Sequence, residues 1–531
     1  MMSLQWQLPR EVPPDTAQIG QVILRSHNVY RQVGERFHDL LPEESVFAPL
    51  YEPTGRGAIS PLLLSLVTVF QMLEKVPDRL AAEYVVSRLD WKYALHLSVT
   101  YQGFHFSVLS AFRARLLSHQ QERLMFEQLL KRLKELGLLK AGGKMRTDST
   151  HVLGLVERLS QLELVTESLR LALQAVQQAA AEWVEVNLPV AFCEAYEQRQ
   201  QEYGLSQREV QLRLRKAGRD GFWLLGQLEQ RGSASLQQLP EVVVLRQVLT
   251  QQFPAGPDGP PASKRPSGEG IIESPHEPEA RGAMKREQGW VGYRAHVTES
   301  CDEGRPHLIV DLQASEAMAQ DSGELAVLQA RLQAQEVVPS EQQADQGYVN
   351  GRNIATSRQR GIELVGPVPA DHLDRPGFRQ EDFVIDEAAH QVVCPAGQTS
   401  SLWSERWGEE GEPATVQVRF AGETCQACKS FGRCTNCRRG RGLELNAYRR
   451  ELAERRALLQ TEAYRQKLRQ RAGIEGTISQ LVRGHGLRYA RYRGLAKVRL
   501  QGLFTAVAVN LKRLICWCLP AKSVRSMVKA S

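Results

Sequence analysis

Three acidic residues stand in short motifs whose composition suits metal-assisted chemistry. Asp148 lies in Thr-Asp-Ser-Thr, Asp345 in Ala-Asp-Gln-Gly-Tyr and Glu475 in Arg-Ala-Gly-Ile-Glu-Gly-Thr. Magnesium prefers carboxylate oxygens, and two such ions about 3.5–4 Å apart can activate an attacking oxygen and stabilise a leaving one in phosphoryl transfer. Because the chain has 60 Asp and Glu residues, any single acid is more often solvated or paired, so the hypothesis depends on the motif contexts.

A cluster of cysteines forms a second group that could bind metal. Two C-x2-C pairs, Cys425/Cys428 and Cys434/Cys437, follow a separate Cys394. Such turns can present four thiolates tetrahedrally to zinc. One candidate set is the two pairs, and the other is Cys394 with Cys425, Cys428 and Cys434. Unliganded thiols are the alternative, and a redox role is less favoured. The other cysteines, 193, 301, 516 and 518, are expected to be ordinary buried residues.

A basic segment with interleaved tyrosines follows the third acid. Residues 483–499 contain no Asp or Glu, and their basic side chains are Arg483, Arg488, Arg491, Arg493, Lys497 and Arg499. Arg and Lys suit phosphates, and tyrosine can stack on bases, so the segment is expected to contact DNA. The alternative is a solvated helix end. His485, Arg488 and Tyr489 or Tyr492 also imitate a tyrosine recombinase motif, but the tyrosine follows too closely to reach a phosphate as a nucleophile.

Charge and composition limit the class of protein. The 531 residues carry a net charge of +7, with 42% hydrophobic residues, as in ordinary globular proteins. Residues 438–531 hold 22 Lys/Arg and 5 Asp/Glu, a net of +17, so the rest of the chain sums to −10. This asymmetry indicates a polyanionic partner, with nucleic acid first. No apolar run approaches the roughly 20 residues of a membrane span, and the N-terminus does not resemble a signal peptide. We therefore expect a cytoplasmic, nucleoid-associated protein with reduced thiols.

The elements that must position these residues alternate between helical and strand-like patterns. Ser60-Pro61 predicts a helix start, and Thr- and Val-rich residues 144–153 predict a strand. Two strands are expected over 289–312, a helix over 322–335, a strand near 362–368 and basic helices from 445 to 517. The sequence predicts a helical N-terminal domain over 1–140, possibly DNA-binding. The core would be formed by residues 141–154 and 285–380 and completed by basic helices over 441–531. Three segments would interrupt it: a helical insertion over 155–253, a Pro/Gly linker over 254–284 and a β/Cys-rich insertion over 381–440.

The ordered set of motifs resembles a bacterial DDE-type insertion-sequence transposase. The set comprises TDSTHV, GWVGYRAHVTESCD, PHLIVDLQ, ADQGYV, ELVGPV, the cysteine cluster, RAGIEGTISQ, GLRYARYRGLAKVRLQ and AVAVNLKRL, over about residues 55 to 515. More narrowly, the sequence resembles the group of these transposases that has a helical N-terminal domain and a cysteine-bearing insert. The resemblance implies an α/β fold with a ribonuclease-H-like mixed-sheet core.

The resemblance also implies a site, a reaction and partners. Asp148, Asp345 and Glu475 would bind magnesium or manganese. The structural zinc expected at the cysteines rests on their spacing instead. The substrate would be double-stranded DNA, both terminal inverted repeats and target, cleaved and joined by a homodimer on DNA.

Several alternatives stay open at this point. Asp311, in the apolar segment Leu-Ile-Val-Asp-Leu, is a rival second metal ligand. Arg471, one helical turn before Glu475, could clamp a phosphate or pair with that glutamate. A hydrolytic nuclease of the same fold and a non-catalytic, zinc-stabilised DNA-binding protein are the competing functions. The polar segment 338–344 before Asp345, where such a core wants an apolar strand, favours the non-catalytic reading.

Overall fold

The computed structural model describes residues 7–55, 57–200, 202–266, 268, 270–285, 288–369, 377–407 and 415–518. The chain forms two compact units. Unit 1 comprises residues 1–140, 149–319 and 475–531, and unit 2 comprises residues 141–148 and 320–474. Strand β1 (Lys144–Leu153) runs without interruption from unit 2 into unit 1.

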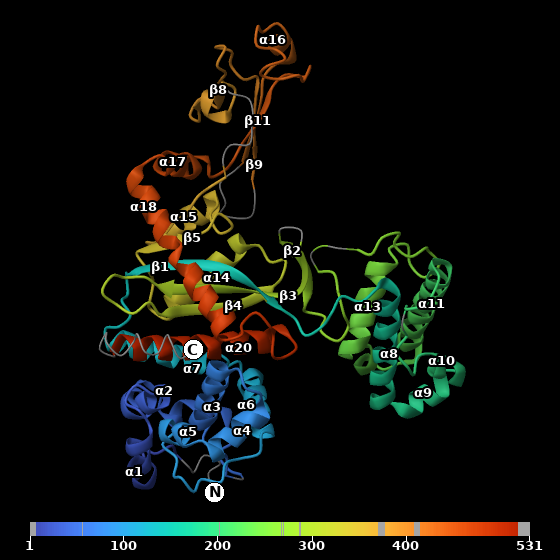
Figure 1. The fold of residues 1–531 in the computed structure, drawn as a ribbon. Helices are drawn as coiled ribbons and strands as arrows, with labels where there is room; N and C mark the ends of the chain where they lie inside the picture. Colours follow the sequence, from blue (N-terminus) through green and yellow to red (C-terminus); the bar gives the residue numbers. More distant parts are fainter. Residues whose placement is uncertain are drawn as a thin grey trace. The chain divides into compact units, whose positions relative to one another are not determined.

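The first part of unit 1 is helical and gathers around α3 (Figure 1). Ser60 caps this helix by accepting a hydrogen bond from the Leu63 amide, and nearly all of α3 is buried. The helices here are α1 (Pro14–Ile23), α2 (Val29–Gln32), α3 (Pro61–Glu74), α4 (Asp78–Ser87), α5 (Leu89–Ala94), α6 (Ser107–Ser118) and α7 (Leu124–Glu135), with shorter turns η1 (Val33–Phe37), η2 (His38–Leu40) and η3 (Glu44–Leu50).

A helical insertion within unit 1 has a hydrophobic core of its own. Capping boxes at Ser160/Glu163 and Ser206/Glu209 start its two longest helices, and leucines and valines of α8, α11 and α13 fill the core. Its helices are α8 (Gln161–Ala179), α9 (Ala181–Asn187), α10 (Val190–Ala195), α11 (Gln207–Arg231), α12 (Ala234–Gln237) and α13 (Pro240–Gln252).

Unit 1 also contains antiparallel strands covered by the long helix α20 (Leu495–Cys518). β3 (Gln288–Ser300) pairs with β2 (Arg281–Lys285) and β4 (Ile309–Glu316). The buried Asn510 side chain of α20 accepts from the Ile309 amide at 2.7 Å and donates to its carbonyl at 2.8 Å. A Cβ on Gly502 would lie 2.3 Å from a Leu312 methyl, so this glycine permits the close approach of α20 to β4.

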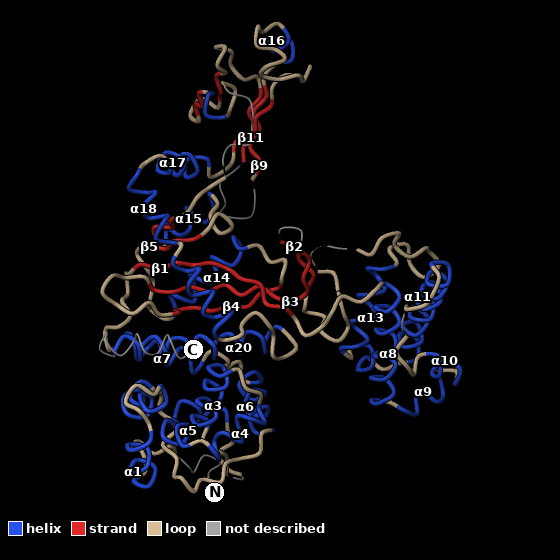
Figure 2. Tube along the Cα trace, in the orientation of Figure 1, coloured by secondary structure: helices blue, strands red, loops and turns tan. Residues whose placement is uncertain are grey.

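Unit 2 contains parallel strands. The first residues of β1 pair with β5 (Glu341–Ala344), which pairs with β6 (Glu363–Val365). The sheet has the order β2-β3-β1-β5-β6, with β4 beside β3, so the fold is mixed α/β (Figure 2). Helices α14 (Asp321–Ala334) and α15 (Gly351–Gln359) flank β5 and β6 in the chain.

The rest of unit 2 is a small β-rich region followed by two basic helices. Its elements are η4 (Gln380–Asp382), β7 (Val384–Asp386), β8 (Gln391–Val393), β9 (Leu402–Arg406), β10 (Thr415–Arg419), α16 (Gly422–Gln426), β11 (Gly442–Leu445), α17 (Arg449–Leu459) and α18 (Glu462–Arg471). Helix α19 (Gly473–Ser479) crosses from unit 2 into unit 1 after Ile474, and η5 (Gln480–Gly484) follows it.

Most expected elements are present, with two differences. The strand expected over 144–153 and the helix starting at Pro61 have the predicted bounds. β2 lies partly in the segment expected to be linker, and the polar segment before Asp345 does form a strand, β5. Among the described residues, no helix is both long and apolar enough to cross a membrane.

Candidate active site

Asp148 and Asp345 occupy equivalent places on neighbouring parallel strands of unit 2. The last paired residues of β1 and β5 in this register are Thr147 and Ala344, and each acid follows directly. Both side chains are half-buried. Because adjacent strands lie about 4.8 Å apart, the register brings the two acids to the same edge of this part of the sheet.

Buried polar side chains hold β5, the strand that Asp345 follows, in place. The amide of Gln342 donates to Thr147 Oγ1 at 2.9 Å, and Gln329 Nε2 donates to Gln342 Oε1 at 2.9 Å. Gln343 donates to Glu341 Oε1 at 2.9 Å. Lys467 Nζ lies 2.7 Å from Glu341 Oε2. A buried polar group costs little when it is hydrogen-bonded, so a polar sequence can form an interior strand here.

An ion pair with Lys467 keeps the carboxylate of Glu341 in β5 ionised. Burial raises the pKa of the Glu341 carboxyl, but hydrogen bonds from Lys467 and Gln343 outweigh it, so the pKa lies below its ordinary value. Burial correspondingly lowers the pKa of Lys467, while its bonds to Glu341 and Glu363 raise it overall. The pair is therefore charged, and it ties α18 to β5 and β6 within unit 2.

A tight turn orients the Asp345 carboxylate. The Gly347 amide donates to Asp345 Oδ1 at 2.6 Å. A Cβ on Gly347 would lie 2.8 Å from Asp321 Oδ2 and 3.1 Å from Asp345 Oδ1, so a side chain there would crowd both acids. This explains the Asp-Gln-Gly motif. It also brings in Asp321, the first residue of α14, which sequence reasoning did not single out.

Arg471 contacts Asp148. Its Nη1 lies 3.1 Å from Asp148 Oδ2, and both side chains are about one-fifth exposed. Arg146, one of the last β1 residues before Asp148, donates from Nη1 to the Gln470 carbonyl at 3.0 Å. A Cβ on Gly473 would lie 1.8 Å from Arg146 Nη1, so the glycine of the Arg-Ala-Gly motif makes room for this guanidinium. Within unit 2, Asp148 is thus a partner of Arg471 that sequence reasoning did not foresee.

Glu475 is exposed on α19, and it belongs to unit 1. Two residues later, buried Thr477 donates to the fully buried Glu299 of β3. Arg513 of α20 lies 2.8 Å from Glu299 through Nη1 and donates to Thr477 Oγ1 at 2.5 Å. This buried network fixes the helical turn that carries Glu475. Sequence reasoning missed Glu299 and Arg513, because nothing local marks a buried ion pair.

Asp311, the rival metal ligand, is fully buried in the interior of β4. Its Oδ1 lies 2.7 Å from Arg123 Nη2 of the N-terminal helices. Asp311 therefore forms a buried ion pair within unit 1.

The basic segment after Glu475 divides into two groups. Arg488 donates to the His151 carbonyl at 2.6 Å, Arg491 donates to the Val76 carbonyl, and Arg499 donates to the Ala314 carbonyl at 3.4 Å. These three side chains are only partly exposed, whereas Arg483, Arg493 and Lys497 are exposed. All six remain candidates for DNA contact, and the exposed three are the ones available at the surface of unit 1.

The residues that resemble a tyrosine recombinase motif are not all exposed to solvent. His485 is 5% exposed, and burial lowers its pKa to about 4. The Tyr492 hydroxyl is buried, although Tyr489 is 64% exposed. The motif therefore lacks an exposed set of histidine, arginine and tyrosine.

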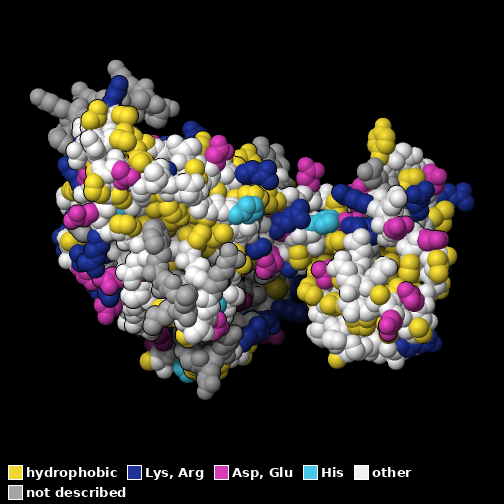
Figure 3. All heavy atoms as spheres, turned by 90° about the horizontal axis from the view of Figure 1, so that it is seen from below, with side chains coloured by type: hydrophobic (Ala, Val, Ile, Leu, Met, Phe, Trp, Pro, Cys, Tyr) yellow, Lys and Arg dark blue, Asp and Glu magenta, His cyan; other side chains and the backbone are white. Residues whose placement is uncertain are grey.

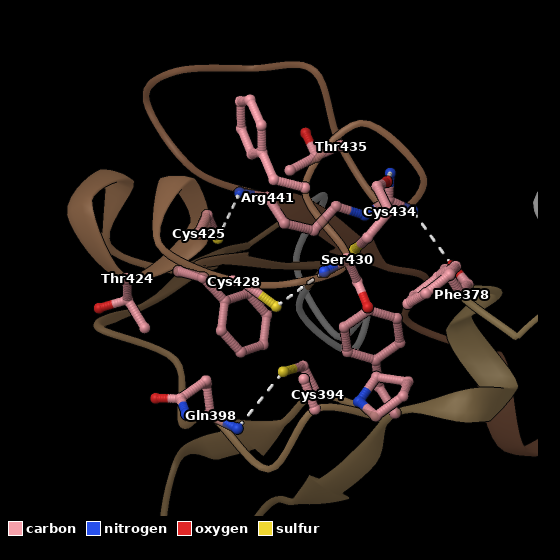
Figure 4. Close-up of a pocket in the computed structure, with 15 residues that line it drawn as sticks. Phe378, Cys394, Gln398, Thr424, Cys425, Cys428, Ser430, Cys434, Thr435 and Arg441 are labelled. Atoms are coloured by element: carbon pink, nitrogen blue, oxygen red, sulfur yellow. Dashed lines mark hydrogen bonds between the residues drawn. The ribbon is translucent and has the colours of Figure 1, made fainter.

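Four cysteines of unit 2 line one small cavity of about 30 Å³, and Figure 4 shows their sulfurs facing it. The amides of Gln398, Ser430 and Arg441 each lie 3.4 Å from a sulfur, those of Cys394, Cys428 and Cys425 respectively. Burial raises the pKa of the fourth, Cys434; Arg441 lowers it, and the other three thiols raise it further.

The remaining cysteines differ from expectation. Cys437 is exposed and does not line the cavity. Cys193, Cys301 and Cys516 are partly exposed and Cys518 is exposed, so the expectation that these four are buried is wrong. No group of three or more His, Cys, Asp or Glu side chains among the described residues stands in an arrangement that could hold a metal ion.

Two segments of the chain match families of known proteins. Residues 393–515, which include the four cavity cysteines, Glu475 and the basic segment, match a family described as Transposase DDE domain. Residues 20–115, within the N-terminal helices, match a family described as Transposase domain (DUF772). Both matches are consistent with a DDE-type insertion-sequence transposase, the family that the motifs resemble. No curated protein matches the chain.

Proposed function

We propose that this transposase cleaves and joins DNA at the terminal inverted repeats of its element, using Asp148, Asp345 and Glu475. The observation that carries the proposal is the matched position of Asp148 and Asp345 at the ends of paired parallel strands. The mixed sheet supports a ribonuclease-H-like core. Hydrogen bonds to Gln342 and an ion pair to Glu341 allow the polar β5 to lie in the interior, which weakens the main reason to regard the chain as a non-catalytic relative.

The carboxylates fit a magnesium or manganese site. Magnesium is commonly held by one or two carboxylates together with substrate phosphates, and Asp148 and Asp345 are two half-buried carboxylates on adjacent strands. Bound there, the ion would supply charge neutralisation and oxygen activation for phosphoryl transfer. Glu475 would complete the ligand set.

The chain's own residues would position the DNA. Arg471 can exchange Asp148 for a phosphate, since its guanidinium already lies beside that carboxylate. Arg483, Arg493 and Lys497 are exposed and would hold the backbone of the duplex, which we expect to be bound by a homodimer. Water would attack first and a freed 3′-hydroxyl second, so no covalent protein–DNA intermediate is needed.

Cleavage of labelled terminal DNA with magnesium tests the proposal. Asp148→Asn, Asp345→Asn and Glu475→Gln should each lower the cleavage rate by about a thousandfold, or about 4 kcal/mol, and leave DNA binding nearly unchanged. Asp311→Asn should lower the thermal stability, because it leaves Arg123 without its buried partner, but its folded fraction should still cleave. Normal cleavage by Asp345→Asn together with loss of cleavage by folded Asp311→Asn would make Asp311 the second metal ligand. Cleavage without strand transfer would identify a hydrolytic nuclease.

The proposal includes one structural zinc ion bound by Cys394, Cys425, Cys428 and Cys434. Support comes from the shared cavity and from the three backbone amides that face sulfur. Because no three of these thiols already stand in a metal-holding arrangement, binding would draw them together.

Metal analysis of freshly purified, reduced protein tests the zinc site. About one zinc per chain is expected, and Cys428→Ser should lower both zinc content and melting temperature. Cys437→Ser is the matched control and should change neither, since this thiol is exposed and outside the cavity. Absence of zinc from the reduced protein would refute the site.

A further inference from the structure

One face of α11 carries three arginines with no acidic residue three or four positions away. Arg208, Arg215 and Arg219 are exposed and follow one another at seven and four residues, so they share the side of the helix opposite its buried leucines. Leu212 and Trp223, 59% and 38% exposed, lie on the same side. Figure 3 shows dark-blue Lys and Arg side chains together with magenta Asp and Glu side chains on the molecular surface.

The acids of this helix are engaged elsewhere. Glu209 belongs to the capping box with Ser206. Asp220 accepts from the Tyr196 hydroxyl at 2.5 Å and lies 3.5 Å from Lys216. None of the positions three or four residues from Arg208, Arg215 or Arg219 holds an acid. The arginines on this face therefore lack an intrahelical counterion.

The arrangement has an energetic cost. Arg215 and Arg219 stand at i and i+4, and Lys216 and Arg219 at i and i+3, where like charges repel. Such pairs destabilise a helix by about 0.2–0.5 kcal/mol each, whereas Glu at one of those positions would stabilise it. Packing of the insertion does not require these side chains, because its core is formed by the opposite face. A polyanionic ligand would offset the repulsion.

We infer that the Arg208–Arg215–Arg219 face of α11 is a DNA-backbone contact of the transposase. The inference rests on the proposed DNA cleavage, and it assigns a binding role to an insertion that no motif marks. Eleven residues of helix span about 16 Å, enough to reach several phosphates of a duplex that carries one charge per roughly 1.7 Å. Guanidinium groups suit phosphate oxygens, and the indole N–H of Trp223 can donate to phosphate as well.

Filter-binding titrations of the full-length protein with linear duplex DNA test this inference. Replacing Arg208, Arg215 and Arg219 together with Ala should weaken binding about tenfold or more at 0.1 M salt. If all three touch phosphate, it should flatten the slope of log K against log salt by about two to three units. The melting temperature should stay the same or rise, because the repulsion is removed; a merely structural role predicts a fall. Lys at the three positions should largely restore binding.

A matched variant controls for net charge. Arg199, Arg231 and Arg246 also lie in the helical insertion but off this face, and their replacement with Ala removes the same charge. That variant should keep the wild-type salt slope. Equal slopes for the two triple variants would overturn the inference while leaving the proposed cleavage intact. Failure of the wild-type protein to bind or cleave any duplex would overturn both.

Discussion

At the scale of single residues, the contact between Arg471 and Asp148 should affect how tightly the proposed site binds a metal ion. The guanidinium lies 3.1 Å from a carboxylate oxygen that we propose as a metal ligand. A cation at Asp148 and the Arg471 side chain would compete for that oxygen. Since the pair is partly exposed, the competition is worth no more than about 1 kcal/mol.

Arg471→Ala tests this competition. The variant should bind manganese up to about fivefold more tightly, as followed by electron paramagnetic resonance, because Asp148 loses its internal cation. Cleavage should nevertheless fall, since the proposed phosphate contact is also lost. Arg471→Lys keeps the charge and should retain near wild-type manganese affinity. Unchanged affinity in the alanine variant would mean that the ion pair does not oppose metal binding.

At the scale of elements, prediction from sequence succeeded where local pattern is sufficient. β1 contains Thr147, Thr150 and Val152 after two glycines, and α3 begins at a Ser-Pro pair, so the strand and the helix start could be read directly. β5 could not be recognised, because Glu341, Gln342 and Gln343 are polar yet buried. Their partners Thr147, Gln329 and Lys467 come from three other segments.

At the candidate site, too, local motifs could be recognised in the sequence, whereas contacts between distant residues could not. The motifs predicted Asp148 and Asp345 as metal ligands, and the structure places each directly after the last paired residue of β1 or β5. The Thr477–Glu299–Arg513 network and the Asp311–Arg123 pair were not predictable, since each joins residues about 180 or more positions apart. The basic segment was identified by composition, but composition does not distinguish Arg488, bound to a carbonyl, from exposed Arg493.

At the scale of the whole molecule, buried histidines make stability depend on pH. Burial lowers the pKa of His485 to about 4. Burial, with the adjacent His96, lowers the pKa of His38 to about 3. The rings of His38 and His96 stack at 3.3 Å between centroids. His485 and His38 are therefore neutral when folded and take up a proton on unfolding below about pH 6.5.

Stability should consequently fall as the pH drops from about 6.5 toward 4. His485 alone should cost about 3 kcal/mol by pH 4. Urea unfolding at pH 7.5, 6 and 5 measures the effect. His485→Asn should unfold more easily at pH 7.5 but lose less stability on acidification. A variant with the same pH dependence as the wild type would show that His485 is not responsible.

The pairing of β1 with β5 has a consequence for how the protein is made. Thr147 pairs with Ala344, a residue translated 197 positions later. At about 5–20 residues per second, the ribosome needs roughly 10–40 s to supply that partner. The helical insertion, which has a core of its own, is synthesised within that interval and can fold in it. During that time the edge of β1 awaiting β5 has unpaired backbone groups, the kind of edge on which nascent chains associate. Translation speed and chaperone access over residues 154–340 should thus affect the yield of native protein.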